Sequence, residues 1–103
     1  MPSMKYPRLV FKEEFDERLA FEVAQKGWCG IAVVQLPNGD SREVFFYDPG
    51  RLAQDLEVGI KSGEPFIAEP GLIVIPEVTL AYMNEAVNKL FDGGYFDRLT
   101  RPE

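Results

Sequence analysis

The sequence predicts one α+β domain, in which helices pack on an antiparallel sheet built on a central β-hairpin. Two β-rich runs, 30–36 and 41–47, flank the turn sequence Pro37-Asn38-Gly39-Asp40. Apolar residues recur at helical spacing in three other segments. The 103 residues are 46% hydrophobic and 13% aromatic, enough for one core without disulfides. The domain therefore spans residues 1–103, with 1–6 and 101–103 expected to fray.

The first elements are a short strand and a helix. Residues 8–11 are apolar and follow a proline, which favours a strand or an extended lead-in. A helix is predicted at 13–26, with acidic residues in its first turn, Gly27 as C-cap and an apolar stripe of Phe15, Leu19 and Val23. Phe21 lies off this stripe and alternates with its neighbours, so a strand is the alternative for this segment.

The central hairpin has a predicted register. With Asn38-Gly39 as a two-residue type I′ loop, one face pairs Gln35 with Arg42, Val33 with Val44, and Ile31 with Phe46. The opposite face then carries Ala32, Val34, Leu36, Phe45 and Tyr47, with Ser41 and Glu43 as its polar members. A solvated face is normally more polar, so we expect another element or a partner to cover this one.

A second helix is predicted after Asp48 as N-cap and Pro49 at the first helical position. Its stripe is Leu52, Leu56 and Ile60, and it ends at 62–63. Gly59 lies inside this helix, where it costs about 1 kcal/mol relative to alanine unless a neighbour packs against the bare backbone. A type II turn at 69–71 then separates two further apolar runs, 66–68 and 72–75. The second run is apolar on both faces, which predicts a central strand.

The last helix is expected after Thr79 as N-cap, with Gly93-Gly94 at its end. It has an apolar stripe of Leu80, Met83, Val87, Leu90 and Phe91. We expect the tail to fold back through Tyr95, Phe96 and Leu99. The whole order is compatible with a ferredoxin-like βαββαβ sheet plus a C-terminal helix. Without the first strand, a smaller antiparallel or mixed sheet would remain.

The composition of the chain excludes several classes of catalytic and metal-binding site. The chain has no histidine and a single cysteine, so histidine bases, histidine-ligated metals, internal disulfides and multi-thiolate clusters are ruled out. One thiol and no apparent signal peptide or membrane span predict a soluble cytoplasmic protein without a cofactor. The net charge is −6, mostly carried by the second half, and no basic cluster stands out. Nucleic acid and membranes are therefore not expected as partners.

Each residue that could take part in catalysis or binding is explained more simply by a structural role. Cys29 is expected to be a buried small side chain, because a reactive thiolate needs a nearby cation. The acids Glu64, Glu69 and Glu77 match no metal-binding loop and are expected to be solvated turn charges. Asp48 is expected to cap the helix amides that would otherwise attract a phosphate at Gly50. We therefore predict no catalytic, cofactor-binding or metal-binding residues.

The function predicted from the sequence is protein–protein association. The chain would act as a homodimer or as an accessory or regulatory subunit, without catalysis of its own. The candidate association surface comprises Trp28, Ala32, Val34, Leu36, Phe45 and Tyr47. The alternative is a small-ligand-binding protein, or an enzyme using carboxylates and tyrosine, with a pocket against the sheet.

Overall fold

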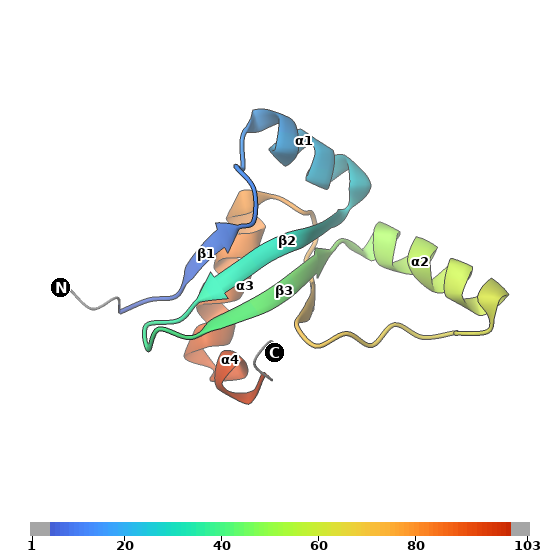
Figure 1. Ribbon diagram of the computed structural model, residues 1–103. Coiled ribbons are helices and arrows are strands. Elements are labelled where there is room, and N and C mark those ends of the chain that lie inside the picture. Colours follow the sequence, from blue (N-terminus) through green and yellow to red (C-terminus); the bar gives the residue numbers. More distant parts are fainter. Residues whose placement is uncertain (1–4, 100–103) are drawn as a thin grey trace.

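The computed structural model describes residues 5–99, which form an α+β fold with one four-stranded sheet (Figure 1). In chain order its elements are β1 (Arg8–Phe11), α1 (Glu17–Lys26), β2 (Trp28–Gln35), β3 (Ser41–Tyr47), α2 (Pro49–Ser62), β4 (Leu72–Val74), α3 (Leu80–Asp92) and α4 (Tyr95–Arg98). The predicted strand at 8–11 is therefore present. The fraying expected at 1–4 and 101–103 lies outside the described residues.

The strands are arranged in the order β1-β2-β3-β4. The first three form an antiparallel meander, whereas β3 and β4 are parallel, so the sheet is mixed. A split βαβ unit would separate β1 from β2 by another strand, but here these two strands pair directly. The ferredoxin-like arrangement is therefore not formed. The prediction of a central strand at 72–75 is also wrong, since β4 lies at the edge of the sheet formed by the described residues.

The hairpin turn has three loop residues rather than two. The amide of Leu36 donates to the carbonyl of Asp40 at 2.8 Å, and the amide of Gly39 donates to the carbonyl of Leu36 at 3.0 Å. Gly39 has φ 94°, whereas Asn38 does not have a positive φ, so the type I′ prediction is wrong. Pro37 suits the first central position of an ordinary type I turn, which a left-handed glycine then extends by one residue.

This longer loop shifts the register by one residue. Gln35 pairs with Ser41 and Val33 pairs with Glu43, instead of with Arg42 and Val44 as predicted. A bulge between Cys29 and Ala32 changes the pairing again before Trp28 meets Tyr47. Because side chains alternate between faces, the one-residue shift moves half of the hairpin to the opposite face from the one predicted.

One face of the sheet forms the core. It carries Ala32, Val34, Leu36, Arg42, Val44, Phe46 and Ile73, all of which are buried. Behind this face lies α3, while α1 closes one end of the sheet (Figure 1). These helices and α4 contribute the buried side chains Leu19, Val23, Met83, Val87 and Phe96. The apolar stripes predicted for the first and last helices therefore supply the core, except that Leu80 at the start of α3 is 45% exposed, and the tail does fold back.

The first helix begins later than predicted. Asp16 is its N-cap and accepts a hydrogen bond from the amide of Leu19 at 2.9 Å, so the helix starts at Glu17 rather than at 13. Phe15 lies before the helix and stacks on Phe11, with ring centroids 4.4 Å apart. An aspartate at the cap position satisfies the first free amides, which explains why the acidic stretch upstream stays non-helical.

The second helix is capped as predicted but projects from the body. Asp48 accepts a hydrogen bond from the amide of Arg51 at 2.7 Å, and Gly63 ends the helix with φ 89°. A Cβ at Gly59 would lie 2.4 Å from the carbonyl oxygen of Glu64, because the chain turns back against the helix there. Yet all 14 residues of α2 are at least partly exposed, and the helix extends away from the sheet (Figure 1).

The segment after α2 returns to the sheet without regular secondary structure. The apolar run at 66–68 lies in this irregular segment. The type II turn is confirmed, because Gly71 has φ 85° and the amide of Leu72 donates to the carbonyl of Glu69 at 3.1 Å. Within residues 5–99, none of the helices has the length and apolar character needed to cross a membrane.

Candidate functional site

The structure splits the candidate association surface between the two faces of the sheet. Ala32, Val34 and Leu36 are 1%, 0% and 2% exposed and belong to the core, so their assignment to an outer surface is wrong. The cause is the one-residue register shift set by the three-residue loop. The other three predicted residues, Trp28, Phe45 and Tyr47, are brought together on the opposite face.

We call this opposite side the open face. By register it includes the six apolar residues Trp28, Val33, Phe45, Tyr47, Leu72 and Val74, together with Val10 of β1 and the polar residues Arg8, Gln35, Ser41 and Glu43 towards the hairpin turn. All six are partly or well exposed, and Val74 is 47% exposed. Sequence reasoning missed Val33, Leu72 and Val74, because the first depends on the register and the other two depend on the pairing of β4 with β3. The open face is therefore apolar and aromatic at the end near α2 and more polar at the end near the hairpin turn.

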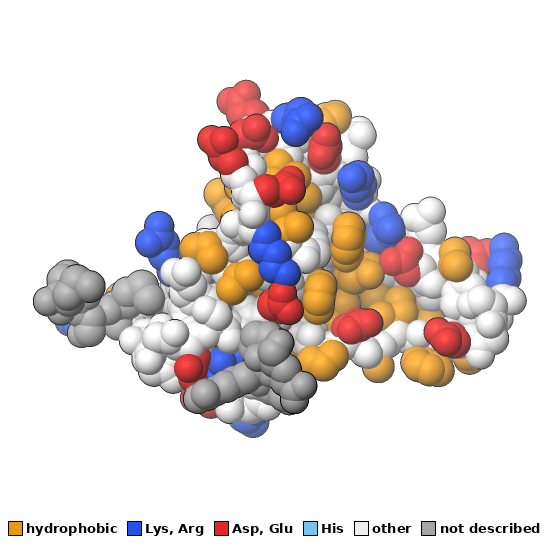
Figure 2. Space-filling model, viewed as in Figure 1, with side chains coloured by type: hydrophobic (Ala, Val, Ile, Leu, Met, Phe, Trp, Pro, Cys, Tyr) orange, Lys and Arg blue, Asp and Glu red, His pale blue; other side chains and the backbone are white. Residues whose placement is uncertain are grey.

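A second apolar surface lies beside the open face. We call residues 49–70, which comprise α2 and the returning segment, the arm. Its side chains Val58, Ile60 and Phe66 are 62%, 59% and 65% exposed. In the space-filling view, hydrophobic side chains spread from the strands towards the arm (Figure 2). Among the described residues, the open face and the arm together carry half of the large exposed apolar side chains, namely Val58, Ile60, Phe66 and Val74.

The base of the arm is held by specific contacts. The amide of Asp48 donates to the carbonyl of Gly27 at 2.9 Å. Arg51 donates through Nη1 to the carbonyl of Lys26 at 3.3 Å and through Nε to Asp55 at 2.9 Å. Its guanidinium carbon also lies 5.9 Å from the centroid of the Trp28 ring. These contacts tie the first turn of α2 to the junction between α1 and β2, and so set the direction of the arm.

Tyr47 lies near this base and has a perturbed ionisation. Partial burial, followed by the negative charge of Asp55, raises the pKa of Tyr47 above its ordinary value. A phenol that is harder to ionise is a poor general base at neutral pH. Tyr47 is therefore better suited to contact a partner through its ring and hydroxyl group than to transfer a proton.

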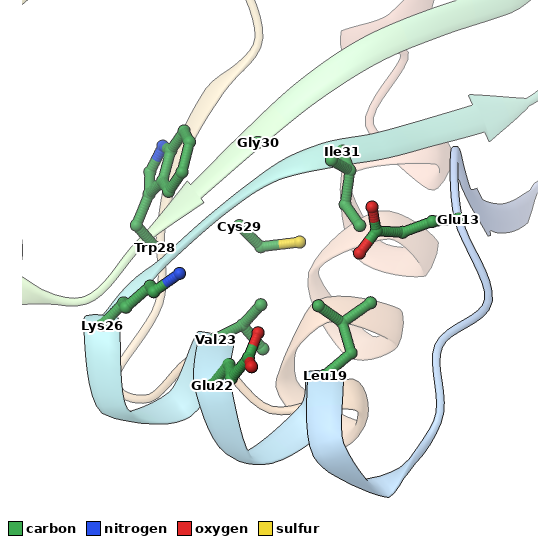
Figure 3. A pocket seen from close by; sticks show the side chains of 9 residues that line it. All are labelled: Glu13, Leu19, Glu22, Val23, Lys26, Trp28, Cys29, Gly30 and Ile31. Carbon is green, nitrogen blue, oxygen red and sulfur yellow. The ribbon is translucent and has the colours of Figure 1, made fainter.

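A small cavity lies between α1 and β2 (Figure 3). Its volume is about 150 Å³, and its apolar lining comes from Leu19, Val23, Cys29 and Ile31. Glu13, Glu22 and Lys26 also line it. In the close-up the sulfur of Cys29 points towards α1, whereas the ring of Trp28 lies on the opposite side of the strand (Figure 3). Trp28 nevertheless lines part of this cavity, so it belongs to both the cavity and the open face.

The Cys29 thiol is buried, and its surroundings do not activate it as a nucleophile. Only 1% of the residue is exposed, and burial raises the pKa of the thiol above its ordinary value. The charge of Glu13 raises this pKa further, although a backbone hydrogen bond at Ile31 opposes the shift. A protonated, buried thiol is a weak nucleophile.

We expect Cys29 of the native protein to react with a thiol-specific reagent at mildly alkaline pH at least about tenfold more slowly than in the unfolded chain. The unfolded protein is the internal control, since it contains the same single thiol. Reaction at equal rates in the two states would contradict the buried position. Because the folded pKa is raised, the free energy of unfolding should also decline as the pH rises above about 8.5, where the unfolded thiol ionises.

The acidic residues considered as possible ligands or catalytic groups do not form a site in the structure. Glu64, Glu69 and Glu77 are exposed turn residues. Asp48 is occupied as a helix cap, since it accepts from the amide of Arg51. Within the described part of the chain, no three histidine, cysteine, aspartate or glutamate side chains are grouped so that they could hold a metal ion.

Comparisons with protein-family models, with curated proteins and with solved structures gave no significant match to this chain. The functional argument therefore depends on the open face, the arm and the cavity beside Cys29.

Proposed function

We propose that this protein acts by association with another protein chain through the open face, and that it has no catalysis of its own. It is a small, acidic, cytoplasmic protein that works either as a homodimer or as an accessory or regulatory subunit. The observation that carries this proposal is the cluster of Trp28, Phe45 and Tyr47 on a sheet face that α3 leaves uncovered.

The chemistry of this face suits a protein partner. Tryptophan, tyrosine and phenylalanine are enriched at protein–protein interfaces, where they supply large rigid contact areas. Nucleic acid would also stack on aromatic side chains, but it needs a basic surface along its backbone. Here the net charge is −6, and Lys12 beside the open face is paired with Glu43. A protein surface is therefore the better match.

The alternative function, a ligand site or carboxylate enzyme, has weaker support. The cavity beside Cys29 measures about 150 Å³, below the range of about 300–1,000 Å³ that is typical for sites of drug-sized ligands. It also lies on the core side of β2. The open face therefore supports association more strongly than this cavity supports catalysis.

The proposal is tested by placing a charge on the open face. Phe45→Glu should weaken association by about 30-fold or more, because a buried aromatic anchor contributes 2 kcal/mol or more to binding. Phe21→Glu is the matched control, since Phe21 is a 63% exposed phenylalanine on α1. Self-association is measured by light scattering at several concentrations. Association with other proteins is measured by retention on the immobilised chain from an extract of the native cells.

The comparison between the two variants decides the outcome. Association lost in Phe45→Glu and retained in Phe21→Glu would support the open face as the interface. If both variants associate as the wild type does, or if the wild type associates with nothing, the proposed function is wrong.

A further inference from the structure

We propose that the occupant of the open face is the arm of a second copy of this chain, so that two chains exchange arms around a twofold axis. This inference rests on the proposed function and names its partner. Each chain would supply one arm and receive one arm, which makes the two contacts identical.

The topology explains why the arm and the open face belong together. Neighbouring parallel strands such as β3 and β4 need a crossover connection, and its helix ordinarily packs on a face of the sheet. The core face is already occupied by α3, and the helix of this crossover is α2 (Figure 1). Instead of covering the open face, α2 projects from the sheet, so that within residues 5–99 no helix covers the open face (Figure 1).

Only the base of the arm contacts the open face of its own chain, through Arg51 over Trp28 and Asp55 beside Tyr47, whereas the rest of α2 projects away from the sheet (Figure 1). At its base, Asp48 is bonded to Gly27, and Arg51 is bonded to Lys26 and lies over Trp28. At its far end, the amide of Glu64 donates to the carbonyl of Gly59 at 2.7 Å. Turning α2 back over its own sheet would break the contacts at its base. A second chain can supply an arm without breaking any of them.

The dimensions of the two surfaces agree. A helix of 14 residues is about 21 Å long at 1.5 Å per residue. The outer strands of a four-stranded sheet lie about 14 Å apart, since neighbouring strands are separated by about 4.8 Å. An arm can therefore cross the whole width of the open face, from β4 to β1.

The charges at the two surfaces are opposite, although the chain as a whole is acidic. Residues 5–12, which include β1, carry three basic and no acidic side chains, and Lys12 among them is paired with Glu43. The arm carries two basic and four acidic side chains, and its pairs Arg51–Asp55 and Lys61–Glu57 leave Glu64 and Glu69 as its surplus charge. Opposite local charge favours an arm whose far end, near Glu64, lies beside Lys5 and Arg8 at the β1 edge of the partner chain. Two copies can thus attract each other locally despite their net charges of −6.

The decisive experiment is complementation between two damaged copies. Phe45→Glu damages the face, and Ile60→Glu damages the arm at a side chain that is 59% exposed. Wild-type protein should have twice the monomer mass of 11.7 kDa, and each variant alone should be monomeric. An equimolar mixture should recover a dimer, because the intact arm of the Phe45→Glu chain fits the intact face of the Ile60→Glu chain.

Two controls keep this test decisive. Phe21→Glu should remain dimeric, since Phe21 lies on α1 outside both surfaces. If Phe45→Glu does not fold, as judged by circular dichroism, Val74→Glu replaces it, because Val74 is on the open face and 47% exposed. Native mass spectrometry, with one variant isotopically labelled, identifies the mixed dimer.

The other outcomes separate this inference from the proposed function. A dimer that persists in Ile60→Glu but not in Phe45→Glu would mean that two open faces pack together; arm exchange would then be wrong and association through the face would stand. A monomeric wild type that retains another protein through Phe45 would also overturn arm exchange alone. A wild type that binds neither itself nor another protein would overturn both.

Discussion

Phe46→Ala is expected to lower the free energy of unfolding by about 3–5 kcal/mol, the range for removing a buried phenylalanine from a well-packed core. Phe46 is 0% exposed and lies near the end of β3, where it is paired with Cys29 on one side and Ile73 on the other. Urea unfolding followed by the fluorescence of Trp28 would measure the change. The protein concentration must be low enough for the wild type to be monomeric, because association through the open face would itself stabilise the folded state.

The matched control is Phe45→Ala, at the next residue of the same strand. Phe45 lies on the open face and is only partly buried, so its truncation should cost less than about half as much. A larger loss for Phe45 than for Phe46 would contradict the observed register and would support the register that the sequence predicts.

Arg42→Ala should also be strongly destabilising, by about 2–4 kcal/mol. Arg42 is 5% exposed, and its Nε donates to the carbonyls of Phe96 and Leu99 at 3.2 and 3.1 Å. Its Nη1 donates to the carbonyl of Ser41 at 2.9 Å, and Asp40 lies 3.8 Å away. Alanine would leave the buried carbonyls of the C-terminal segment without this donor. Urea unfolding gives the loss of stability, and faster trypsin cleavage after Arg98 reports the loosening of α4.

Two further substitutions define what Arg42 contributes. Arg42→Lys keeps the charge but has no planar fork of donors, so it should recover only part of the lost stability. Arg18→Ala removes an exposed arginine from α1 and should change stability by less than about 0.5 kcal/mol. An equally small effect of Arg42→Ala would show that the guanidinium does not hold the C-terminal segment.

Local signals in the sequence predicted the elements well. Asp48 and Thr79 accept hydrogen bonds from helix amides as expected, and Gly27 and Gly63 end their helices with positive φ. Helix capping involves residues that are close in sequence, so it can be predicted from the sequence alone. The same is true of Gly59, where the predicted close approach comes from Glu64, five residues away.

The candidate site was predicted less well, because it depends on one residue of register. Asn38-Gly39 favours a two-residue loop, whereas Pro37 also fits a three-residue loop, and both are compatible with the local sequence. The choice between them decides whether Phe45 or Phe46 lies on the same face as Val34. Both hairpin strands are apolar on both faces, so the hydrophobic pattern alone does not distinguish the two registers.

Interactions between distant segments were the hardest to predict. Arg42 resembles a surface residue in sequence, since it stands between Ser41 and Glu43, and its buried role depends on carbonyls more than 50 residues away. The run at 72–75 was predicted to be central because it is apolar on both faces. It lies at the sheet edge, where Val74 is on the open face and Ile73 is in the core.

The parallel pairing of β3 with β4 has a consequence for how the chain folds. The strands β1, β2 and β3 pair over shorter connections. The strand β4 can pair with β3 only after the segment between Tyr47 and Leu72, which contains the arm, has formed a long loop. During that interval the edge of β3 presents unpaired amides and carbonyls to other chains. Aggregation of newly made protein should therefore begin at β3, before the last strand docks and closes this edge.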